Sequence, residues 1–332
     1  MKKRVALIYG GEGSEREISR LSAENVDALI DKELYDVTHV EISGNAQWYI
    51  RRDGEKIPTF PIMLDGKSGF LDRCGILEVD CAVPCLHGDF GEDGVVQGAL
   101  TLAHIKYIGQ DVYSSALTSD KAYTRAVSDV LGIPGAKWLL ATEDLSYEAR
   151  LRAEKEIGYP MFIKPARQGS SFGSNPVKSS LDFDSAYRDA KRYGKRVLIE
   201  ELVDYDFELE CALFESGEQR FSAGGRILSG GGFYDYRSKY NSDASPVTEA
   251  KSGKFPRAEA LALEYSKRLA DFIGIKHISR FDFFVTSDER VYFNEINAFP
   301  GMTGTSLYPL LTEDMGFLRG EFINRLISEV SE

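Results

Sequence analysis

The stretch from 279 to 297 constrains the fold of this chain more than any other, because polar and apolar residues alternate along two short runs joined by a polar turn. Such alternation predicts two antiparallel strands with one wet face and one buried face. In a symmetric hairpin, Asp282 lies opposite Glu295. The next pair on the same face is Arg280 and Asn297. Opposed carboxylates on a sheet repel each other unless a cation lies between them.

The wet face of this hairpin therefore offers two carboxylates and one amide oxygen to a cation. Hard oxygen ligands suit Mg²⁺, which takes one or two carboxylates and leaves its other positions to water and substrate phosphate. We expect a Mg²⁺-nucleotide platform at Asp282, Glu295 and Asn297. Arg280 beside it can stabilise negative charge on a transferring phosphoryl or acyl group. A surface hairpin with solvated charges is the alternative that these residues alone leave open.

Length and charge narrow the class of protein. A chain of 332 residues is expected to fold as two or three domains. Its formal net charge of -12 argues against nucleic acid or an anionic membrane as the main partner. Apolar runs stay far below the roughly 20 residues that span a bilayer. We therefore expect a cytoplasmic protein.

The amino-terminal part predicts a parallel α/β unit. A strand over 4–9 runs into the turn GGEGS and a helix over 17–30. A dinucleotide fingerprint fails here because Arg16 stands at its third glycine position, which disfavours a Rossmann oxidoreductase. The carboxylate of Glu15 suits the ammonium group of a ligand instead. A second strand over 80–86 ends in HGDFGEDG, so His87 lies where open α/β sheets bind ligands. Between them we expect a hairpin over 47–60 and a loop over 58–69.

The middle of the chain carries a candidate phosphate loop. Residues 166–175, rich in Gly and Ser, follow a strand that ends in Lys164, and Lys121 lies in the first turn of a predicted helix. Strands over 197–202 and 207–214 place Glu200 and Glu208 at the ends of an apolar lining that suits a purine and a ribose. The long segment 229–253 is a candidate lid.

These segments resemble the D-alanine:D-alanine ligases of the ATP-grasp superfamily, over essentially the whole chain. The resemblance is carried by GGEGSEREIS (10–19), HGDFGEDGVVQG (87–98), SDK (119–121), IKPARQGSSFGS (163–174), VLIEE (197–201), FYDYRSKY (233–240), RFD (280–282) and NEINAFPGMTGTSLYP (294–309). It implies an α/β fold of three domains. These are an amino-terminal substrate-binding domain (1–112), a central ATP-grasp domain (113–204) and a carboxy-terminal ATP-grasp domain (205–332), with ATP between antiparallel sheets of the last two.

The resemblance also implies roles for individual residues. The ATP-binding residues are Lys121, Lys164, Ser170, Ser171, Glu200, Glu201, Val203, Glu208 and Lys239, with Glu210 as the alternative to Glu208 at the ribose. The magnesium ligands are Asp282, Glu295 and Asn297, for two ions that Mn²⁺ can replace. The substrate-binding residues are Glu15, His87, Arg280, Ser306 and Leu307. The catalytic residues are Glu15, Ser170, Tyr240, Arg280 and Gly301.

The implied activity is ATP-dependent ligation of two D-alanines through an acyl phosphate, for peptidoglycan precursors, in a homodimer. Relatives that accept D-lactate tend to replace the loop tyrosine, and those that prefer D-serine tend to carry arginine after the serine of the last motif. Tyr240 and Leu307 occupy these places, which favours D-alanine as second substrate over D-serine or D-lactate. A nucleotide-binding regulatory protein without catalysis is the alternative from a different class.

Overall fold

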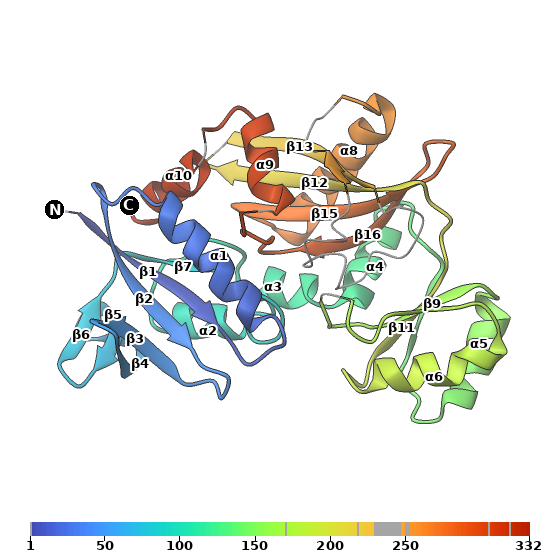
Figure 1. Ribbon diagram of the computed structural model, residues 1–332, viewed down its shortest axis with the longest axis horizontal. Coiled ribbons are helices and arrows are strands. Elements are labelled where there is room, and N and C mark those ends of the chain that lie inside the picture. The colour runs from blue at the N-terminus through green and yellow to red at the C-terminus, as the bar shows by residue number, and fades with distance from the viewer. Residues whose placement is uncertain are drawn as a thin grey trace.

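In the described part of the computed structural model the strands form three β-sheets in a row, with the carboxy-terminal sheet in the middle (Figure 1). The structure describes residues 2–169, 171–217, 219–228, 247–249, 253–304, 306–318 and 320–332. The sheet of the amino-terminal segment has seven strands, and the other two have four and five. The predicted α/β fold class is confirmed. The division at 112/113 and 204/205 stays a prediction.

Parallel strands form the centre of the amino-terminal sheet, where β1 pairs with β2 and β7. The elements are β1 (Lys3–Gly10), α1 (Arg16–Leu29), β2 (Tyr35–Ile42), β7 (Cys81–Pro84) and α2 (Val95–Leu102). Strand β1 is apolar on both faces because both faces are covered. Val5 and Leu7 pack in one core cluster with α1, while Ala6 and Ile8 pack in another with α2.

A meander of four antiparallel strands extends this sheet. The strands are β3 (Trp48–Arg52), β4 (Glu55–Leu64), β5 (Lys67–Asp72) and β6 (Gly75–Glu78). The predicted hairpin is confirmed, with Asp53 (φ 51°) and Gly54 (φ 83°) in the left-handed conformation that a two-residue hairpin turn needs. The predicted loop over 58–69 is wrong, because β4 continues to Leu64. Pro58 lies where β4 pairs with β3 alone and Pro61 where it pairs with β5 alone, and such edges tolerate proline.

The central segment is an antiparallel sheet backed by two helices. Its strand order is β10-β9-β11-β8. The elements are β8 (Trp138–Ala141), α5 (Ser146–Glu156), β9 (Met161–Pro165), β10 (Asn175–Val177), α6 (Ser180–Lys191) and β11 (Val197–Glu201). Helices α3 (Val112–Thr118) and α4 (Lys121–Val130) connect it to the amino-terminal sheet.

The third sheet carries the predicted hairpin, in the order β14-β13-β12-β15-β16. Its elements are β12 (Phe207–Ser216), β13 (Gln219–Leu228), β14 (Val247–Glu249), α8 (Pro256–Ile273), β15 (Ile278–Val285) and β16 (Val291–Asn297). Phe281, Phe283 and Val285 of β15 are fully buried in the same core cluster as α8. The opposite face of the hairpin therefore remains for polar residues, as the alternation predicts.

The register of the hairpin is confirmed, with one irregularity. Asp282 pairs with Glu295 and Arg280 with Asn297, but nearer the turn Phe283 pairs with Phe293. Within this hairpin, Asn294 is an extra residue that faces no residue of β15. It is a β-bulge, and it brings the two carboxylates opposite each other.

The last helices return to the amino-terminal sheet. They are α9 (Leu307–Asp314) and α10 (Glu321–Val330). Phe322 and Ile323 of α10 pack in the same core cluster as Val5 and Leu7 of β1, so both chain termini lie at one end of the molecule (Figure 1). This packing ties the first and third sheets together.

Candidate active site

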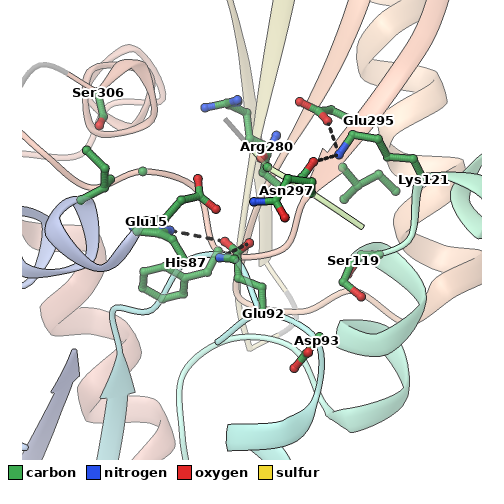
Figure 2. Close-up of a pocket in the computed structure, with 18 of the residues that line it drawn as sticks. Glu15, His87, Glu92, Asp93, Ser119, Lys121, Arg280, Glu295, Asn297 and Ser306 are labelled. Atoms are coloured by element: carbon green, nitrogen blue, oxygen red, sulfur yellow. Dashed lines mark hydrogen bonds and ion pairs between the residues drawn. The ribbon is translucent and has the colours of Figure 1, made fainter. Parts of the chain in front are cut away.

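Two adjoining pockets bring together most of the residues predicted from the sequence. The substrate pocket, as we call the first, lies where the amino-terminal sheet meets the third sheet (Figure 2). The inter-sheet pocket lies between β9 and β11 on one side and β12, β15 and β16 on the other. Residues that line both pockets are Lys121, Gln168, Gly169, Glu210 and Glu295. The two pockets therefore share a border at which a group can pass from one to the other.

The inter-sheet pocket combines aromatic walls with charged ends. Phe162 lines it from the second sheet, and Phe284 lines it from the third, stacked on Tyr205 with ring centroids 4.5 Å apart. The sequence-predicted residues that line it are Lys121, Lys164, Ser171, Glu200, Glu201, Val203, Glu208, Asp282 and Glu295. Flat apolar walls with polar groups at the ends suit a nucleotide. Ser170, Lys239, Tyr240 and most of the candidate lid lie outside the described residues.

The two candidate ribose ligands have different neighbours. Glu208 accepts a hydrogen bond from the Tyr205 hydroxyl at 3.0 Å, beside the stacked rings. Glu210 of β12 is paired directly with Asp282 of β15 and forms an ion pair of 3.1 Å with Arg280. Glu208 is thus at the aromatic wall and Glu210 is at the charged border, which favours Glu208 as the ribose ligand.

Lys164 and Glu200 form a buried ion pair at the floor of this pocket. The Lys164 Nζ lies 2.7 Å from Glu200 Oε2, and the two residues are 6% and 3% exposed. Burial lowers the pKa of Lys164 and outweighs the opposing effect of Glu200. Burial acts to raise the pKa of Glu200, but Arg125 and Lys164 reverse the effect and lower it. Glu200 is therefore ionised, and both its oxygens contact cations.

The carboxylate pair of the hairpin is held by two cations. Arg280 donates to both oxygens of Asp282, at 2.8 and 2.7 Å, and Asn297 Nδ2 donates to Asp282 at 2.9 Å. Lys121 Nζ lies 3.1 Å from Glu295 Oε2. Burial disfavours the charge on Arg280, but Asp282 and Glu210 outweigh it and hold its pKa well above the ordinary value. Two opposed carboxylates with an adjacent amide fit a Mg²⁺ ion that also binds phosphate.

The substrate pocket gathers the remaining predicted residues, which come from the first and third sheets. Glu15, His87, Arg280, Gly301, Ser306 and Leu307 all line it. Glu15 is only 8% exposed, and its carboxylate fits because two neighbours lack side chains. A Cβ on Gly88 would lie 2.6 Å from Glu15 Oε2, and one on Gly169 would lie 2.7 Å from it. Glu15 therefore reaches from the amino-terminal segment to the candidate phosphate loop.

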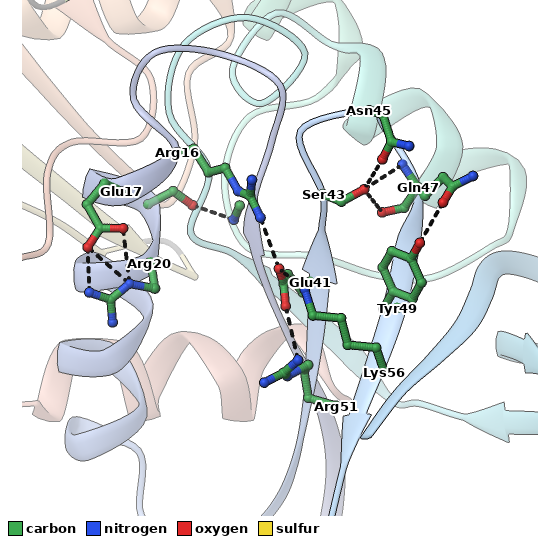
Figure 3. A network of polar contacts seen from close by, with 12 residues as sticks. Arg16, Glu17, Arg20, Glu41, Ser43, Asn45, Gln47, Tyr49, Arg51 and Lys56 are labelled. Atoms are coloured by element: carbon green, nitrogen blue, oxygen red, sulfur yellow. Dashed lines mark hydrogen bonds and ion pairs between the residues drawn. The ribbon is translucent and has the colours of Figure 1, made fainter. Parts of the chain in front are cut away.

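Arg16, the residue after Glu15, belongs to a network of ion pairs on the amino-terminal sheet (Figure 3). Arg16 lies 3.1 Å from Glu41 Oε1, Lys56 lies 2.8 Å from the same oxygen, and Arg51 lies 3.6 Å from Oε2. The pKa of Glu41 is lowered because these cations outweigh its burial. The hairpin over 47–60, whose role was not evident from the sequence, thus supplies two of the three cations that hold Glu41.

The amino terminus of α9 opens into the substrate pocket. Ser306 precedes this helix, and its Oγ accepts from Thr303 N at 3.1 Å. A Cβ on Gly301 would lie 3.0 Å from the same Oγ, so the turn is close-packed. Unpaired N–H groups and the helix dipole favour a negative group here. Leu307 is 5% exposed and presents an apolar side chain beside it.

Two charged residues of the site, Glu92 and Arg125, were missed by the sequence analysis, and Glu210 was considered there only as a ribose ligand. Glu92 contacts His87, whose Nδ1 lies 3.3 Å from Glu92 Oε1 and whose Nε2 lies 3.0 Å from Ser22 Oγ. Burial acts to lower the pKa of His87, but Glu92 and Glu15 outweigh it and raise the pKa. Arg125 follows Lys121 by one helical turn on α4, and this spacing was the only available signal.

A ligand cleft between two antiparallel sheets, with lysines and paired carboxylates at its border, defines the chain as an enzyme of the ATP-grasp fold. Family models described as "D-ala D-ala ligase N-terminus" and "D-ala D-ala ligase C-terminus" match residues 4–110 and 127–328. The chain belongs to the D-alanine–D-alanine ligase family.

Individual relatives match over the full length. The D-alanine–D-alanine ligase of Acetivibrio thermocellus is 33% identical, over 98% of this chain and 95% of its own. The D-alanine–D-alanine ligase of Lactococcus lactis subsp. cremoris is 33% identical, over 100% of this chain and 97% of its own. Among solved structures, D-alanyl-alanine synthetase A from Vibrio cholerae has a TM-score of 0.88 at 28% identity. The match covers 99% of this chain and 98% of that structure's chain. VanG D-Ala:D-Ser ligase from Enterococcus faecalis has a TM-score of 0.89 at 30% identity, covering 99% and 100%.

Among the described residues, each helix is either too short or too polar to cross a bilayer.

The His87–Glu92 contact predicts a pH-dependent stability. The pKa of folded His87 is raised, so its contribution is complete below the unfolded pKa near ~6.5 and is lost as pH rises through the folded value. Glu92→Gln keeps an acceptor for Gly88 N but removes the charge. We expect it to destabilise the protein by about 1 kcal/mol more at pH 6 than at pH 9, measured by denaturant unfolding. Glu33→Gln, at an exposed site, is the control. Equal losses at both pH values would contradict a charged pair.

Proposed function

We propose that this protein joins two D-alanines into D-alanyl-D-alanine at the expense of ATP, through an acyl phosphate. One observation carries the proposal: the substrate pocket and the inter-sheet pocket meet at Lys121 and Glu295. A carboxyl group held by the first pocket can thereby face the terminal phosphate of a nucleotide held by the second. Two magnesium ions, replacement by Mn²⁺, a homodimer and a cytoplasmic role in peptidoglycan precursor synthesis belong to the same proposal.

The inter-sheet pocket is proposed to hold the nucleotide. Phe162 and Phe284 enclose the base, Glu208 takes the ribose, and the backbones of Glu201 and Val203 contact the base edge. Lys121, Lys164 and Ser171 contact the phosphates. Asp282, Glu295 and Asn297 would hold magnesium, which when bound offsets the charge of the phosphates and orients them. Ser170, Lys239 and Tyr240 keep the roles proposed from the sequence.

The substrate pocket is proposed to bind the two amino acids in sequence along its length. Glu15, assisted by His87, holds the ammonium group of the first D-alanine and directs its carboxylate toward the border. That carboxylate forms an O–P bond with the γ-phosphorus, and the bond to ADP breaks. The amine of the second D-alanine then forms a C–N bond with the acyl carbon, loses a proton, and the C–O bond to inorganic phosphate breaks.

Arg280 is placed to act in both steps. It lies between Glu210 and Asp282 at the border, fully charged, where the acyl phosphate and then the tetrahedral oxyanion develop negative charge. Gly301, Ser306 and the amino terminus of α9 receive the carboxylate of the second D-alanine. The enzyme thus works mainly by positioning reactants and by neutralising charge.

The second substrate is the open choice within the family, because VanG, a D-Ala:D-Ser ligase by its title, is about as similar in structure as D-alanyl-alanine synthetase A. Leu307 favours D-alanine, since its apolar side chain offers no partner to a serine hydroxyl. An apolar pocket lowers kcat/KM for a substrate with an added hydroxyl by only ~100-fold. We therefore propose a preference for D-alanine rather than strict exclusion of D-serine.

The decisive experiment is an ADP-release assay with D-alanine, D-serine or D-lactate beside D-alanine, with products identified by mass spectrometry. We expect D-alanyl-D-alanine as the main product and kcat/KM for D-serine about 10- to 100-fold lower. Nucleotide binding without ADP release in any of these mixtures would support the non-catalytic alternative. A larger kcat/KM for D-serine would reassign the second site.

Asp282→Asn tests the carboxylate platform. The substitution keeps the shape and removes one of two negative charges, so the Mg²⁺ concentration at half-maximal rate should rise about tenfold or more. Asp36→Asn, which changes an exposed aspartate of β2, is the matched control. An unchanged Mg²⁺ titration for Asp282→Asn would remove this residue from the metal site.

Gly169→Ala tests the reach of Glu15. The new Cβ would approach both oxygens of Glu15, at 2.7 and 3.1 Å, so the carboxylate must move. We expect kcat/KM for D-alanine to fall about 10- to 100-fold while the melting temperature stays near that of the wild type. Gly194→Ala is the control, because a Cβ there would meet none of the described atoms within 4 Å. Wild-type kinetics for Gly169→Ala would show that Glu15 has no fixed position.

A further inference from the structure

A buried arginine with no place in either pocket lining connects the two halves of the site. Arg125 on α4 is 1% exposed and is among the largest fully buried side chains. Its Nε donates to Glu200 Oε1 at 2.7 Å, while the other oxygen of Glu200 lies 2.7 Å from Lys164 Nζ. Three charges are thus enclosed together, and such a group persists only when its geometry is well satisfied. Through Glu200, Arg125 orients the lysine at the floor of the inter-sheet pocket.

The other end of the same guanidinium is anchored to the third sheet. Its Nη1 donates to the Phe293 carbonyl of β16, and its Cζ lies 5.5 Å from the centroid of the Phe293 ring. Phe293 N donates in turn to Pro134 O at 2.8 Å. A Cβ on Gly135 would lie 2.9 Å from Nη1, so this position leaves room for the guanidinium. The planar fork of arginine can serve both partners at once, whereas a lysine ammonium is a single point charge.

Phe293 immediately precedes the β-bulge that sets the register of the carboxylate pair. If the two strands paired without a bulge, the register of the Phe283–Phe293 pair would continue and would put Asn294 opposite Asp282. Glu295 would then move to the opposite face of the sheet, since successive side chains alternate. Asn294 Oδ1 also accepts from Lys164 Nζ at 3.3 Å. The bulge is therefore fixed from two directions, by Arg125 at the Phe293 backbone and by Lys164 at the Asn294 side chain.

We propose that Arg125 is a positioning residue of the ligation site, which sets Lys164 through Glu200 and the Asp282–Glu295 pair through the Phe293 carbonyl. It touches neither nucleotide nor amino acid. This inference rests on the proposed function, because it assigns Lys164 to phosphate and the carboxylate pair to magnesium. The Arg125 side chain on α4 thereby couples the second sheet to the third, so that the phosphate contact and the metal ligands are aligned together.

The test compares Arg125→Met, Arg125→Lys and the matched control Arg188→Met, which changes an exposed arginine on α6. The readouts are the Kd of ATP at a series of Mg²⁺ concentrations, the kinetic constants, and the melting temperature. For Arg125→Met we expect Kd for Mg²⁺-ATP about tenfold weaker and kcat about tenfold or more lower, with KM for D-alanine within about twofold. Arg188→Met should match the wild type in all of them.

Arg125→Lys separates the two anchors. Lysine keeps the charge beside Glu200, so the affinity for Mg²⁺-ATP should recover to within about threefold of the wild type. It cannot also hold the Phe293 carbonyl, so the Mg²⁺ concentration at half-saturation should stay raised by about threefold or more. A merely structural role predicts a lower melting temperature with unchanged Kd, KM and Mg²⁺ dependence in the folded protein, and this result would overturn the proposal.

Two further results have a separate interpretation, namely a variant that does not fold and a wild type that does not ligate D-alanine. If Arg125→Met does not fold, Arg125→Lys alone decides, and an unchanged Mg²⁺ dependence counts against the proposal. If the wild type binds Mg²⁺-ATP but ligates no D-alanine, the proposed function fails, while the shift in Mg²⁺-ATP binding between wild type and variants still supports or overturns the role of Arg125.

Discussion

The repulsion between Asp282 and Glu295 is the constraint on which the rest of the site depends. Adjacent strands hold these carboxylates opposite each other, and such a pair is unfavourable without positive charge nearby. Arg280 and Lys121 supply that charge, each from a different part of the chain. A cation and a phosphate chain can enter this balance without any new burial of uncompensated charge. The site is thus electrostatically prepared for its ligands, in the sense that the protein fixes the charges before the reactants arrive.

Several important side chains of the site are held by an element other than their own. Lys121 of α4 contacts Glu295 of β16, and Lys164 of β9 contacts Glu200 of β11. Glu15, ahead of α1, is in contact range of Gly169 in the central segment. The Lys164–Glu200 pair lies within the second sheet, but the Lys121–Glu295 and Glu15–Gly169 contacts join different segments of the chain, so the geometry of the site depends on how the sheets are packed together. The shared core of α10 with β1, which closes the row of sheets into one body, therefore contributes indirectly to the chemistry.

Local pattern in the sequence predicted many of the elements and the facing carboxylates of the hairpin, whereas most of the other proposed site residues rested on the family resemblance. The period of two over 279–297 predicted which carboxylates face each other, since side-chain direction in a strand depends only on position. The bulge at Asn294 could not be predicted, because it is stabilised by Arg125, 168 residues away from Phe293 in the chain. Arg125 itself was not predicted, because its one-turn spacing from Lys121 on the same helix was the only signal in the sequence. The strand β4 was missed because its prolines mark a loop unless the strand is known to lie at an edge.

The support for amino-acid binding and the support for nucleotide binding are largely separate in this molecule. Glu15 is followed by Arg16, whose partner Glu41 also contacts Arg51 and Lys56 of the amino-terminal hairpin (Figure 3). Lys164 and the carboxylate pair are backed by Arg125 from the other side of the border. Residues such as Gly169 and Glu295 line both pockets and are where the two supports meet. The contacts of the amino-terminal hairpin reach Arg16 next to Glu15, whereas the contacts that hold Lys164 and the carboxylate pair come from α4, so separate elements fix the surroundings of the two pockets.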